Sequence, residues 1–405
     1  MKFAVQKAWS NSGRARVGVL EFGSNHKIET PSLLLSTRKG LPLFISPDLL
    51  SSLPFPDSHL LQVSPFHFLE GISAKTISDV GGLHDVVGLN SNDYGLVAVP
   101  RDSLVSLPDC DGSNKFGASF ETPGGRRLIK PSDYMNLINS MKPNLWVTLA
   151  DEVPAWVSQK RNKISVDRTI TWLDQCLSAQ NPSNVVVLGP IVGGSDVEER
   201  RRCAVEVSRR NVFGYWIGGF GLGESRNERS DLLSAITDHL PEEKLRQICG
   251  LELPEEVLQG VAAGVDLFDS TYIYHLTLGG FGLSFPLERR TRAIEKDVAI
   301  EPIEKAGSDQ TKINLRHIIH RKDMSPIVED CACYTCRNHT KAYINHLLNV
   351  HEMLAQILLE IHNTHHYLAF FRKIREAIKA GEFEEFHAMF VKNRREHLAV
   401  SSVCA

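Results

Sequence analysis

The sequence lacks the features of several large classes of protein. Its 405 residues contain no apolar run near the ~18 residues that a membrane-spanning helix requires, so no integral membrane segment is expected. The N-terminal stretch carries no apolar core of a secretory signal peptide. The 45 basic and 48 acidic side chains leave a net charge of −3, which gives no global signal for binding nucleic acid or an anionic membrane. Any contact with RNA would have to be local.

Cysteine spacing typical of a disulfide framework is also missing. Five of the eight cysteines are scattered, which argues for a reducing compartment, and we expect a cytoplasmic protein. These five are Cys110, Cys176, Cys203, Cys249 and Cys404. The other three fall close together in Cys331-Ala-Cys333-Tyr-Thr-Cys336. A C-x-C-x-x-C turn brings three thiolates to one point about 2.3 Å from a zinc ion and leaves the fourth tetrahedral position for another ligand.

The fourth ligand is expected to be a histidine, and spacing alone does not choose among the six that follow. They are His339, His346, His351, His362, His365 and His366. Apolar residues recur at helical intervals from Asn345 to about Ile378, which predicts one long helix carrying most of these histidines. On such a helix His346 and His362 would lie about 24 Å apart, so they cannot both bind one ion. The alternative, a reduced cysteine cluster without a metal, is disfavoured by the compactness of the triplet.

Beyond Pro143 the chain alternates short β-rich runs with amphipathic stretches, which is typical of βαβ units. Ser195 and Glu198 predict a capping box that opens a helix continuing to Asn211, and Pro254 lies in the first turn of another helix. Sequential parallel strands with crossover helices indicate a TIM barrel or an open doubly wound sheet. The predicted strands are residues 145–150, 185–188, 214–217, 247–249 and 265–268.

Three other stretches are less regular. Residues 15–37 alternate apolar and polar side chains around Gly23-Ser-Asn25, which predicts a β-hairpin leading into a barrel. Residues 36–143 have only short apolar runs among many glycine, proline, serine and aspartate residues, so few elements are predicted there. Residues 285–323 are charged and weakly periodic, and we expect them to form an insertion that is partly disordered.

In a barrel the functional groups lie at the carboxyl ends of the strands. Asp269 is a candidate nucleophile or general acid there, with Asp151 or Glu152 as its partner. Alternatively, each of these carboxylates has only a structural role, as a helix N-cap or in a turn. Residues 219–223 resemble a phosphate-binding loop, but Glu224 replaces the third glycine and would repel phosphate. We interpret this loop as backbone at the floor of a pocket. The groups at strand ends are Asp151-Glu152, Gly193-Gly194, Gly218-Gly219, Gly250 and Asp269.

Taken together, these segments resemble the tRNA-guanine (queuine) transglycosylases, TIM-barrel enzymes with a zinc site inserted near the end of the barrel. The resemblance runs along most of the chain. Its motifs are Ala15-Arg-Val-Gly-Val-Leu20, Thr30-Pro31, Asp151-Glu152, Gly193-Gly194, Gly218-Gly-Phe-Gly-Leu-Gly-Glu224, Gly264-Val-Asp-Leu-Phe-Asp269, Cys331-x-Cys-Tyr-Thr-Cys336 and Ile361-His-Asn363.

The resemblance implies an α/β fold, a TIM (β/α)8 barrel with an inserted zinc-binding subdomain near the C-terminus. Residues 1–284 and 364–405 would form the barrel body, 285–323 the charged insertion and 324–363 the subdomain. In the family the zinc histidine lies in an IHN segment 26 residues after the last cysteine, which is the position of His362. The resemblance therefore implies one structural Zn²⁺, because four protein ligands leave no open coordination site. Its ligands would be Cys331, Cys333, Cys336 and His362.

The chain also departs from the catalytic members of the family. Their DSGGFQ segment, whose aspartate acts beside the nucleophile, corresponds here to Val99-Pro-Arg-Asp-Ser-Leu104, without the glycine pair. Val192 replaces the glutamine that reads the purine edge, and Ser270-Thr-Tyr-Ile-Tyr-His275 replaces the C-V-x-P-T-R segment after the nucleophile. Base exchange needs a nucleophilic carboxylate, a second acid and donors that hold the base. Only the first is retained, as Asp269.

We therefore expect no catalytic residue, with Asp269 at a vestigial nucleophile position. The resemblance implies a non-catalytic partner that forms a heterodimer with the catalytic queuine tRNA-ribosyltransferase subunit. The pair would bind tRNA and exchange guanine for queuine at the anticodon wobble position. Two alternatives stay open: an active transglycosylase using Asp269 with Asp151 or Asp102, and a zinc-dependent RNA-binding scaffold. Peripheral association with an organelle surface also stays open.

Overall fold

The computed structural model describes residues 1–8, 13–23, 26–104, 106–179, 186–287 and 311–392. These residues divide into two compact units, each with its own buried core. The first unit comprises Met1–Pro42 and Pro56–Thr271, and the second comprises Leu43–Phe55 and Tyr272–Ala405.

The first unit is built on a parallel sheet with the strand order β4-β15-β14-β13-β12-β11-β7-β6-β5. The strands are β4 (Ser32–Leu33), β5 (Leu35–Ser36), β6 (Leu60–Val63), β7 (Gly95–Ala98), β11 (Leu145–Val147), β12 (Val186–Ile191), β13 (Gly214–Ile217), β14 (Leu245–Ile248) and β15 (Leu267–Phe268). β4 and β5 are two parts of one strand on either side of Leu34. Because β4 pairs with β15 and β5 pairs with β6, the sheet closes on itself. The predicted TIM barrel is confirmed.

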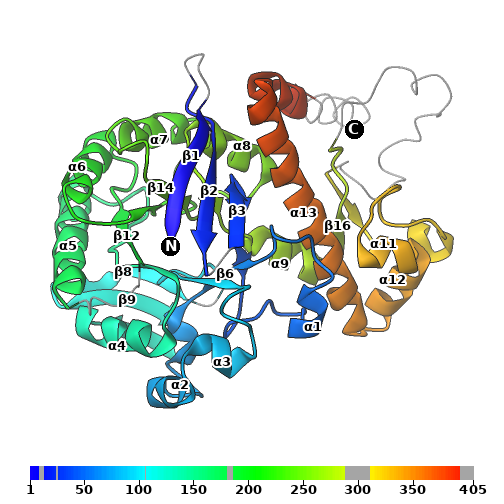
Figure 1. The fold of residues 1–405 in the computed structure, drawn as a ribbon, viewed down its shortest axis with the longest axis horizontal. Helices are drawn as coiled ribbons and strands as arrows, with labels where there is room; N and C mark the ends of the chain where they lie inside the picture. The colour runs from blue at the N-terminus through cyan, green and yellow to red at the C-terminus, as the bar shows by residue number, and fades with distance from the viewer. Residues whose placement is uncertain (9–12, 24–25, 105, 180–185, 288–310, 393–405) are drawn as a thin grey trace. The chain divides into compact units, whose positions relative to one another are not determined.

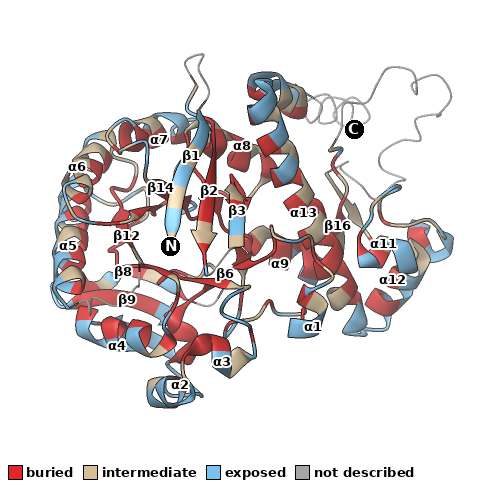
Figure 2. Cartoon of the chain, viewed as in Figure 1, coloured by how far each residue is buried: buried red, intermediate tan, exposed pale blue. Residues whose placement is uncertain are grey.

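Helices follow the barrel strands and lie outside them (Figure 1). They are η1 (Pro65–Phe68), α2 (Ala74–Val80), α3 (Leu83–Val87), α4 (Pro131–Met141), α5 (Gln159–Ser178), α6 (Val197–Ser208), α7 (Arg229–Thr237) and α8 (Pro254–Ala262). Nearly all strand residues of the barrel are buried, whereas the outer faces of the helices are exposed (Figure 2). This distribution is expected for parallel strands, which are covered on both faces and therefore read as nearly continuous apolar runs.

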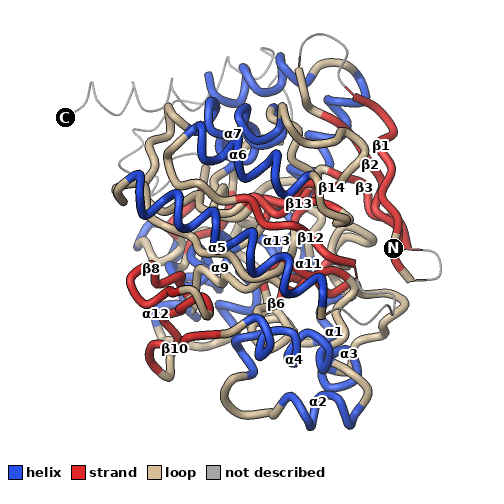
Figure 3. Tube along the Cα trace, turned by 90° about the vertical axis from the view of Figure 1, so that its left-hand side faces the viewer, coloured by secondary structure: helices blue, strands red, loops and turns tan. Residues whose placement is uncertain are grey.

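Two antiparallel sheets are added to the barrel (Figure 3). One consists of β1 (Lys2–Ala8), β2 (Arg16–Phe22) and β3 (His26–Thr30), and it confirms the hairpin predicted within residues 15–37. The other consists of β8 (Leu107–Asn114), β9 (Gly117–Thr122) and β10 (Gly125–Ile129). A buried ion pair ties the first sheet to the barrel, because Arg16 Nε donates to Asp266 Oδ1 at 2.9 Å.

The five strands predicted beyond Pro143 are all present, with ends that differ from the prediction by up to three residues where those ends are described. β6 and β7 were not predicted. Each has only four residues, and loops rich in glycine, proline and serine surround them. A run this short carries too little periodicity to distinguish a barrel strand from a loop.

The predicted capping box at the start of α6 is wrong. The N-cap is Asp196, whose Oδ1 accepts hydrogen bonds from Glu198 N at 2.9 Å and Glu199 N at 3.1 Å. Ser195 and Asp196 are both good capping residues, but the carboxylate satisfies two free N–H groups and carries the charge favoured at a helix N-terminus. The helix also ends at Ser208, before the predicted end at Asn211.

The second unit contains a small sheet and a cluster of helices. Its buried apolar core includes Leu315, Ile344, Leu348, Ala355 and Leu358. The elements are α1 (Pro47–Leu50), most of α9 (Thr271–Gly279), β16 (Phe281–Leu283), β17 (Lys312–Asn314), η3 (Ile318–Lys322), α11 (Tyr334–Asn338), α12 (Lys341–Asn349) and α13 (Leu354–Ala380).

The single long helix predicted from Asn345 to Ile378 is wrong, because α12 and α13 are separate helices. The chain turns between them, where His351 adopts a left-handed conformation with φ of 61°. The apolar period continues through this turn because both helices bury their apolar faces in the same core, so periodicity alone does not reveal the break.

The predicted zinc-binding subdomain ends at residue 363, and the predicted barrel body resumes at residue 364. This limit falls inside the continuous helix α13. Residues 288–310, most of the predicted insertion, lie outside the described residues. The remainder contains β17, which pairs with β16, and η3, which packs against α12.

Substitution of Asp196 by alanine is expected to destabilise the protein by about 1 kcal/mol, because two N–H groups of α6 lose their cap. Ser195→Ala is the matched control and should change the free energy of unfolding by less than about 0.5 kcal/mol. Urea unfolding of both variants provides the measurement. If Ser195→Ala lowered the free energy of unfolding more than Asp196→Ala, Ser195 would instead be the N-cap, as in the predicted capping box.

Candidate metal centre and barrel mouth

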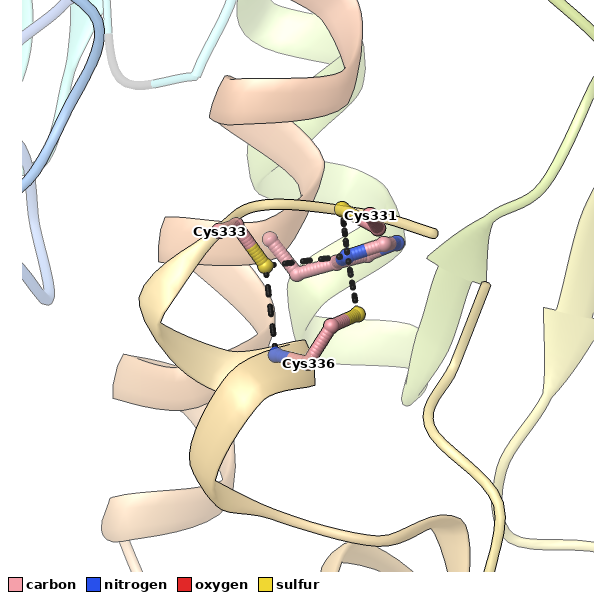
Figure 4. A group of neighbouring side chains, drawn as sticks. Cys331, Cys333 and Cys336 are labelled. Atoms are coloured by element: carbon pink, nitrogen blue, oxygen red, sulfur yellow. Dashed lines mark hydrogen bonds between the residues drawn. The ribbon is translucent and has the colours of Figure 1, made fainter. Parts of the chain in front are cut away.

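Three thiols and one imidazole converge in the second unit. The Sγ atoms of Cys331, Cys333 and Cys336 and a ring nitrogen of His362 all lie within 4.8 Å of one another. His362 Nδ1 lies 3.9, 3.5 and 3.3 Å from the three sulfur atoms in that order. Figure 4 shows the three thiols turned toward the same space. These four side chains could hold a metal ion.

The distances agree with a tetrahedral centre. Ligands at about 2.3 Å (sulfur) and 2.05 Å (nitrogen) from a tetrahedral metal stand about 3.6 Å apart from sulfur to nitrogen. The three observed separations between His362 Nδ1 and the sulfur atoms, 3.3 to 3.9 Å, surround this value. The protein therefore holds the donor atoms close to the positions that one ion needs.

The electrostatics of the thiols also favour a cation. Hydrogen bonds from Cys333 and Cys336 lower the pKa of Cys331, whereas those of Cys331 and Cys336 raise the pKa of Cys333. Ionisation of one thiol at this spacing thus opposes ionisation of the next, because like charges repel. A divalent ion removes the conflict, since it favours the thiolate form of every ligand.

Local structure positions the cysteines. Cys333 is the N-cap of α11, and its Sγ accepts a hydrogen bond from Cys336 N at 3.3 Å. Thr335 Oγ1 donates to the carbonyl oxygen of Leu358 at 2.6 Å, which fixes α11 against α13. The thiols are therefore presented from a short turn whose orientation toward α13 is fixed by a buried hydrogen bond.

The His362 ring is oriented by the small sheet. Its Nε2 donates to the carbonyl oxygen of Leu283 in β16 at 2.9 Å, which turns Nδ1 toward the thiols. Burial lowers the pKa of His362, but Cys331 and Cys336 outweigh it and raise the pKa to about 10, so a metal ion bound at Nδ1 would displace a proton. The neighbouring Asn363 binds the same strand: its Oδ1 accepts from Leu283 N at 2.8 Å and its Nδ2 donates to Phe281 O at 2.9 Å. The Ile361-His-Asn363 segment therefore supplies a ligand and the anchor that holds it.

The other histidines have different surroundings. His365 Nδ1 lies 4.0 Å from Cys331 Sγ alone. His366 is buried, and burial, reinforced by His362, lowers its pKa to about 3, so the neutral ring donates to the carbonyl oxygen of Phe285. In the described part of the chain, His339, His346 and His351 do not contact the thiols, and His346 and His351 are exposed.

A second group of side chains gathers at the carboxyl ends of β14 and β15, where Asp269 Oδ2 accepts from Gly250 N at 3.4 Å. Burial raises the pKa of Asp269, although Cys249 and Arg101 act in the opposite direction. Burial and the charge of Asp269 raise the pKa of Glu252 to about 8. Burial therefore makes Asp269 a weaker acid than a carboxyl group in water.

Arg101 occupies the space beside these carboxyl groups. Its side chain is 4% exposed, and Nη1 donates to Glu152 Oε2 at 3.0 Å and to the carbonyl oxygen of Phe220 at 2.9 Å. Burial opposes the positive charge, but Cys249, Glu152 and Asp269 raise the pKa of Arg101, so it remains a cation. The mouth of the barrel therefore holds a buried ion pair whose arginine interacts electrostatically with Asp269.

Two of the three proposed partners of Asp269, Asp151 and Asp102, are also bound by neighbouring side chains. Asp151 receives Arg161 on both oxygen atoms, at 2.7 and 2.9 Å, and Arg168 at 3.0 Å. Asp102 Oδ2 is hydrogen bonded to His67 Nε2. Two guanidinium groups therefore occupy both carboxylate oxygen atoms of Asp151.

The glycine loops at the strand ends are held by charged side chains. Arg200 donates to the carbonyl oxygens of Gly194, Gly218 and Gly219 at 2.7, 3.0 and 3.0 Å. The Glu224 carboxylate accepts hydrogen bonds from Gly221 N at 2.9 Å and from Leu222 N at 3.0 Å. The carboxylate of Glu224 thus takes the N–H groups that a phosphate would need.

Comparison with known proteins agrees with these features. The family model described as "Queuine tRNA-ribosyltransferase" matches residues 11–396. The chain belongs to this family. The match spans the barrel and the cysteine cluster, so both are parts of one family architecture.

Curated relatives carry a more specific name. "Queuine tRNA-ribosyltransferase accessory subunit 2" of Homo sapiens is 33% identical, over 95% of this chain and 98% of the relative. Relatives of the same name from Xenopus tropicalis and Ixodes scapularis are 34% and 30% identical and cover 94% and 93% of this chain. Those alignments include 97% of each relative. In the described part of the chain, no helix is long and apolar enough to cross a membrane.

Within this family site, sequence reasoning missed Arg101, Arg200 and His67. Arg101 lies in Val99-Pro-Arg-Asp-Ser-Leu104, a segment whose sequence shows the missing glycine pair but gives no sign of what the arginine binds. Its partners, Glu152 and Phe220, are 51 and 119 residues away in the sequence. Contacts of this range have no local signal, because periodicity reports only on near neighbours along the chain.

Removal of the His362 ring by His362→Ala is expected to weaken binding of a divalent metal by more than about a hundredfold, since loss of an outer-shell partner alone costs about ten- to a hundredfold. His346→Ala removes an exposed histidine of α12 and should leave the affinity unchanged. Competition with a coloured chelator measures both. Equal affinities for the two variants would exclude His362 as a ligand.

Proposed function

We propose that this chain is a non-catalytic accessory subunit of a queuine tRNA-ribosyltransferase. It pairs with a catalytic subunit, and the heterodimer exchanges guanine for queuine at the wobble position of tRNA. Family membership and the name of the relatives support this assignment. The observation that carries it is the barrel mouth, where the Arg101–Glu152 ion pair is buried beside Asp269.

The chemistry of base exchange supports the non-catalytic part of the proposal. A carboxylate must attack the anomeric carbon of the ribose while a second acid protonates the departing base. Asp269 remains, but Asp151 is neutralised by two arginines and Asp102 is bound to His67. Val192 has no polar side chain to hold the edge of a base. We therefore assign Asp269 to a vestigial nucleophile position.

We further assign one structural Zn²⁺ to Cys331, Cys333, Cys336 and His362. Three thiolates and one imidazole in a tetrahedral arrangement are a typical zinc donor set. With four protein ligands the ion has no position for substrate, so its role is architectural. It would cross-link the turn before α11 to α13 and β16, the elements that carry the ligands and their anchors.

Exchange of labelled guanine in tRNA tests the proposal when three samples are compared: this chain alone, the catalytic subunit alone, and both together. We expect exchange only from the mixture. Asp269→Asn in this chain should leave the activity of the mixture unchanged, because the nucleophile belongs to the other subunit.

Two results would contradict the assignment. Exchange by this chain alone, lost in Asp269→Asn, would identify an active transglycosylase. Salt-sensitive tRNA binding by this chain alone, without any effect on the catalytic subunit, would instead identify an RNA-binding scaffold.

A further inference from the structure

The guanidinium group of Arg101 has an unusual position for a structural arginine. One nitrogen, Nη1, directs its two hydrogens to a carboxylate and to a main-chain carbonyl, Glu152 Oε2 and Phe220 O. The Nε–H of the same group is buried and makes no hydrogen bond to the described residues. The guanidinium group therefore donates to two acceptors at the mouth of the barrel, while its Nε–H donor has no acceptor among the described residues.

Both acceptors are fixed independently of Arg101. Glu152 Oε2 also accepts from Gly219 N at 2.6 Å. The Phe220 carbonyl lies against Gly250, where a Cβ atom would come within 2.3 Å of the oxygen. Gly250 has φ of 89°, so the lack of a side chain there permits both the backbone conformation and the close approach. The acceptor pair is thus preorganised.

The arrangement of donors in a guanidinium matches one edge of a particular base. A guanine base carries an amino group on a carbon between two ring nitrogens, one of which bears a hydrogen. This N–C–N unit has the planar donor geometry of an arginine head group. Adenine and hypoxanthine have no amino group at this carbon, so they lack the two-hydrogen donor that Nη1 provides.

We propose that Arg101 is an internal stand-in for a guanine base, which fills the base site beside Asp269 and closes it to free bases. The inference deepens the proposed function, on which it rests, because it names the residue that keeps this barrel from taking the base that its family exchanges. The Phe220 carbonyl that Arg101 binds lies against Gly250, and the N–H of Gly250 donates to Asp269 Oδ2 at 3.4 Å, so the stand-in lies close to the nucleophile position.

Binding of free bases to the purified full chain tests this inference. Melting temperature and calorimetric titration are measured for the wild type and for Arg101→Ala with guanine, hypoxanthine and millimolar guanidinium ion. We expect no response from the wild type. The melting temperature of Arg101→Ala should rise with the concentration of guanine or guanidinium. This variant should also bind guanine at least about tenfold more tightly than hypoxanthine, a difference in binding free energy of about 1.4 kcal/mol.

Arg246→Ala is the matched control. Arg246 is also buried, and it donates to the carbonyl oxygens of Gly264 and Leu240 rather than to the groups around Asp269. Its removal should lower stability without any response to guanine. A general effect of deleting a buried arginine would appear in both variants, whereas an opened base site appears only in Arg101→Ala.

The double variant Arg101→Ala with Glu152→Gln removes both charges together and is used if the single variant does not fold. Recovery of either variant only in the presence of guanine or guanidinium supports the inference. It is overturned if neither variant responds to guanine, if guanine and hypoxanthine act equally, or if no ligand restores folding. Such a failure, with the mixed-subunit exchange intact, would leave the accessory role standing.

Discussion

The convergence of three thiols on Nδ1 of His362 is the constraint on which the second unit depends. The cysteines come from a short turn, the histidine from the middle of a 27-residue helix, and the carbonyl that orients its ring from a strand about 80 residues earlier. A single ion would join all three segments. The free energy of binding that ion would add to the stability of this part of the chain.

The barrel uses charge in a different way. Arginines at the strand ends bind carboxylates and carbonyl groups of the same chain: Arg101 at Glu152, Arg161 at Asp151, and Arg200 at the glycine loops. Each group is satisfied within the chain. The result is a barrel mouth in which Asp269 lies among carboxylates and carbonyl groups that are already bound within the chain.

The sequence predicted the barrel, most strands beyond Pro143 and the residues of the cysteine cluster, because these depend on local periodicity, close spacing and motifs shared with a family. It did not predict the N-cap at Asp196, since two capping residues are adjacent, or the turn between α12 and α13, since both helices face one core. Spacing alone left six histidines, and only the family context selected His362. The roles of Arg101 and Arg200 depend on contacts between distant strand ends, which no local pattern contains.

X-ray absorption at the zinc edge of the natively purified chain tests the central claim most directly. We predict one zinc per chain, with three sulfur ligands at about 2.3 Å and one nitrogen ligand at about 2.0 Å. Protein that folds and pairs with its partner without any metal would contradict the account. So would a shell dominated by oxygen atoms, because the ion would then lie outside the Cys331, Cys333, Cys336 and His362 cluster.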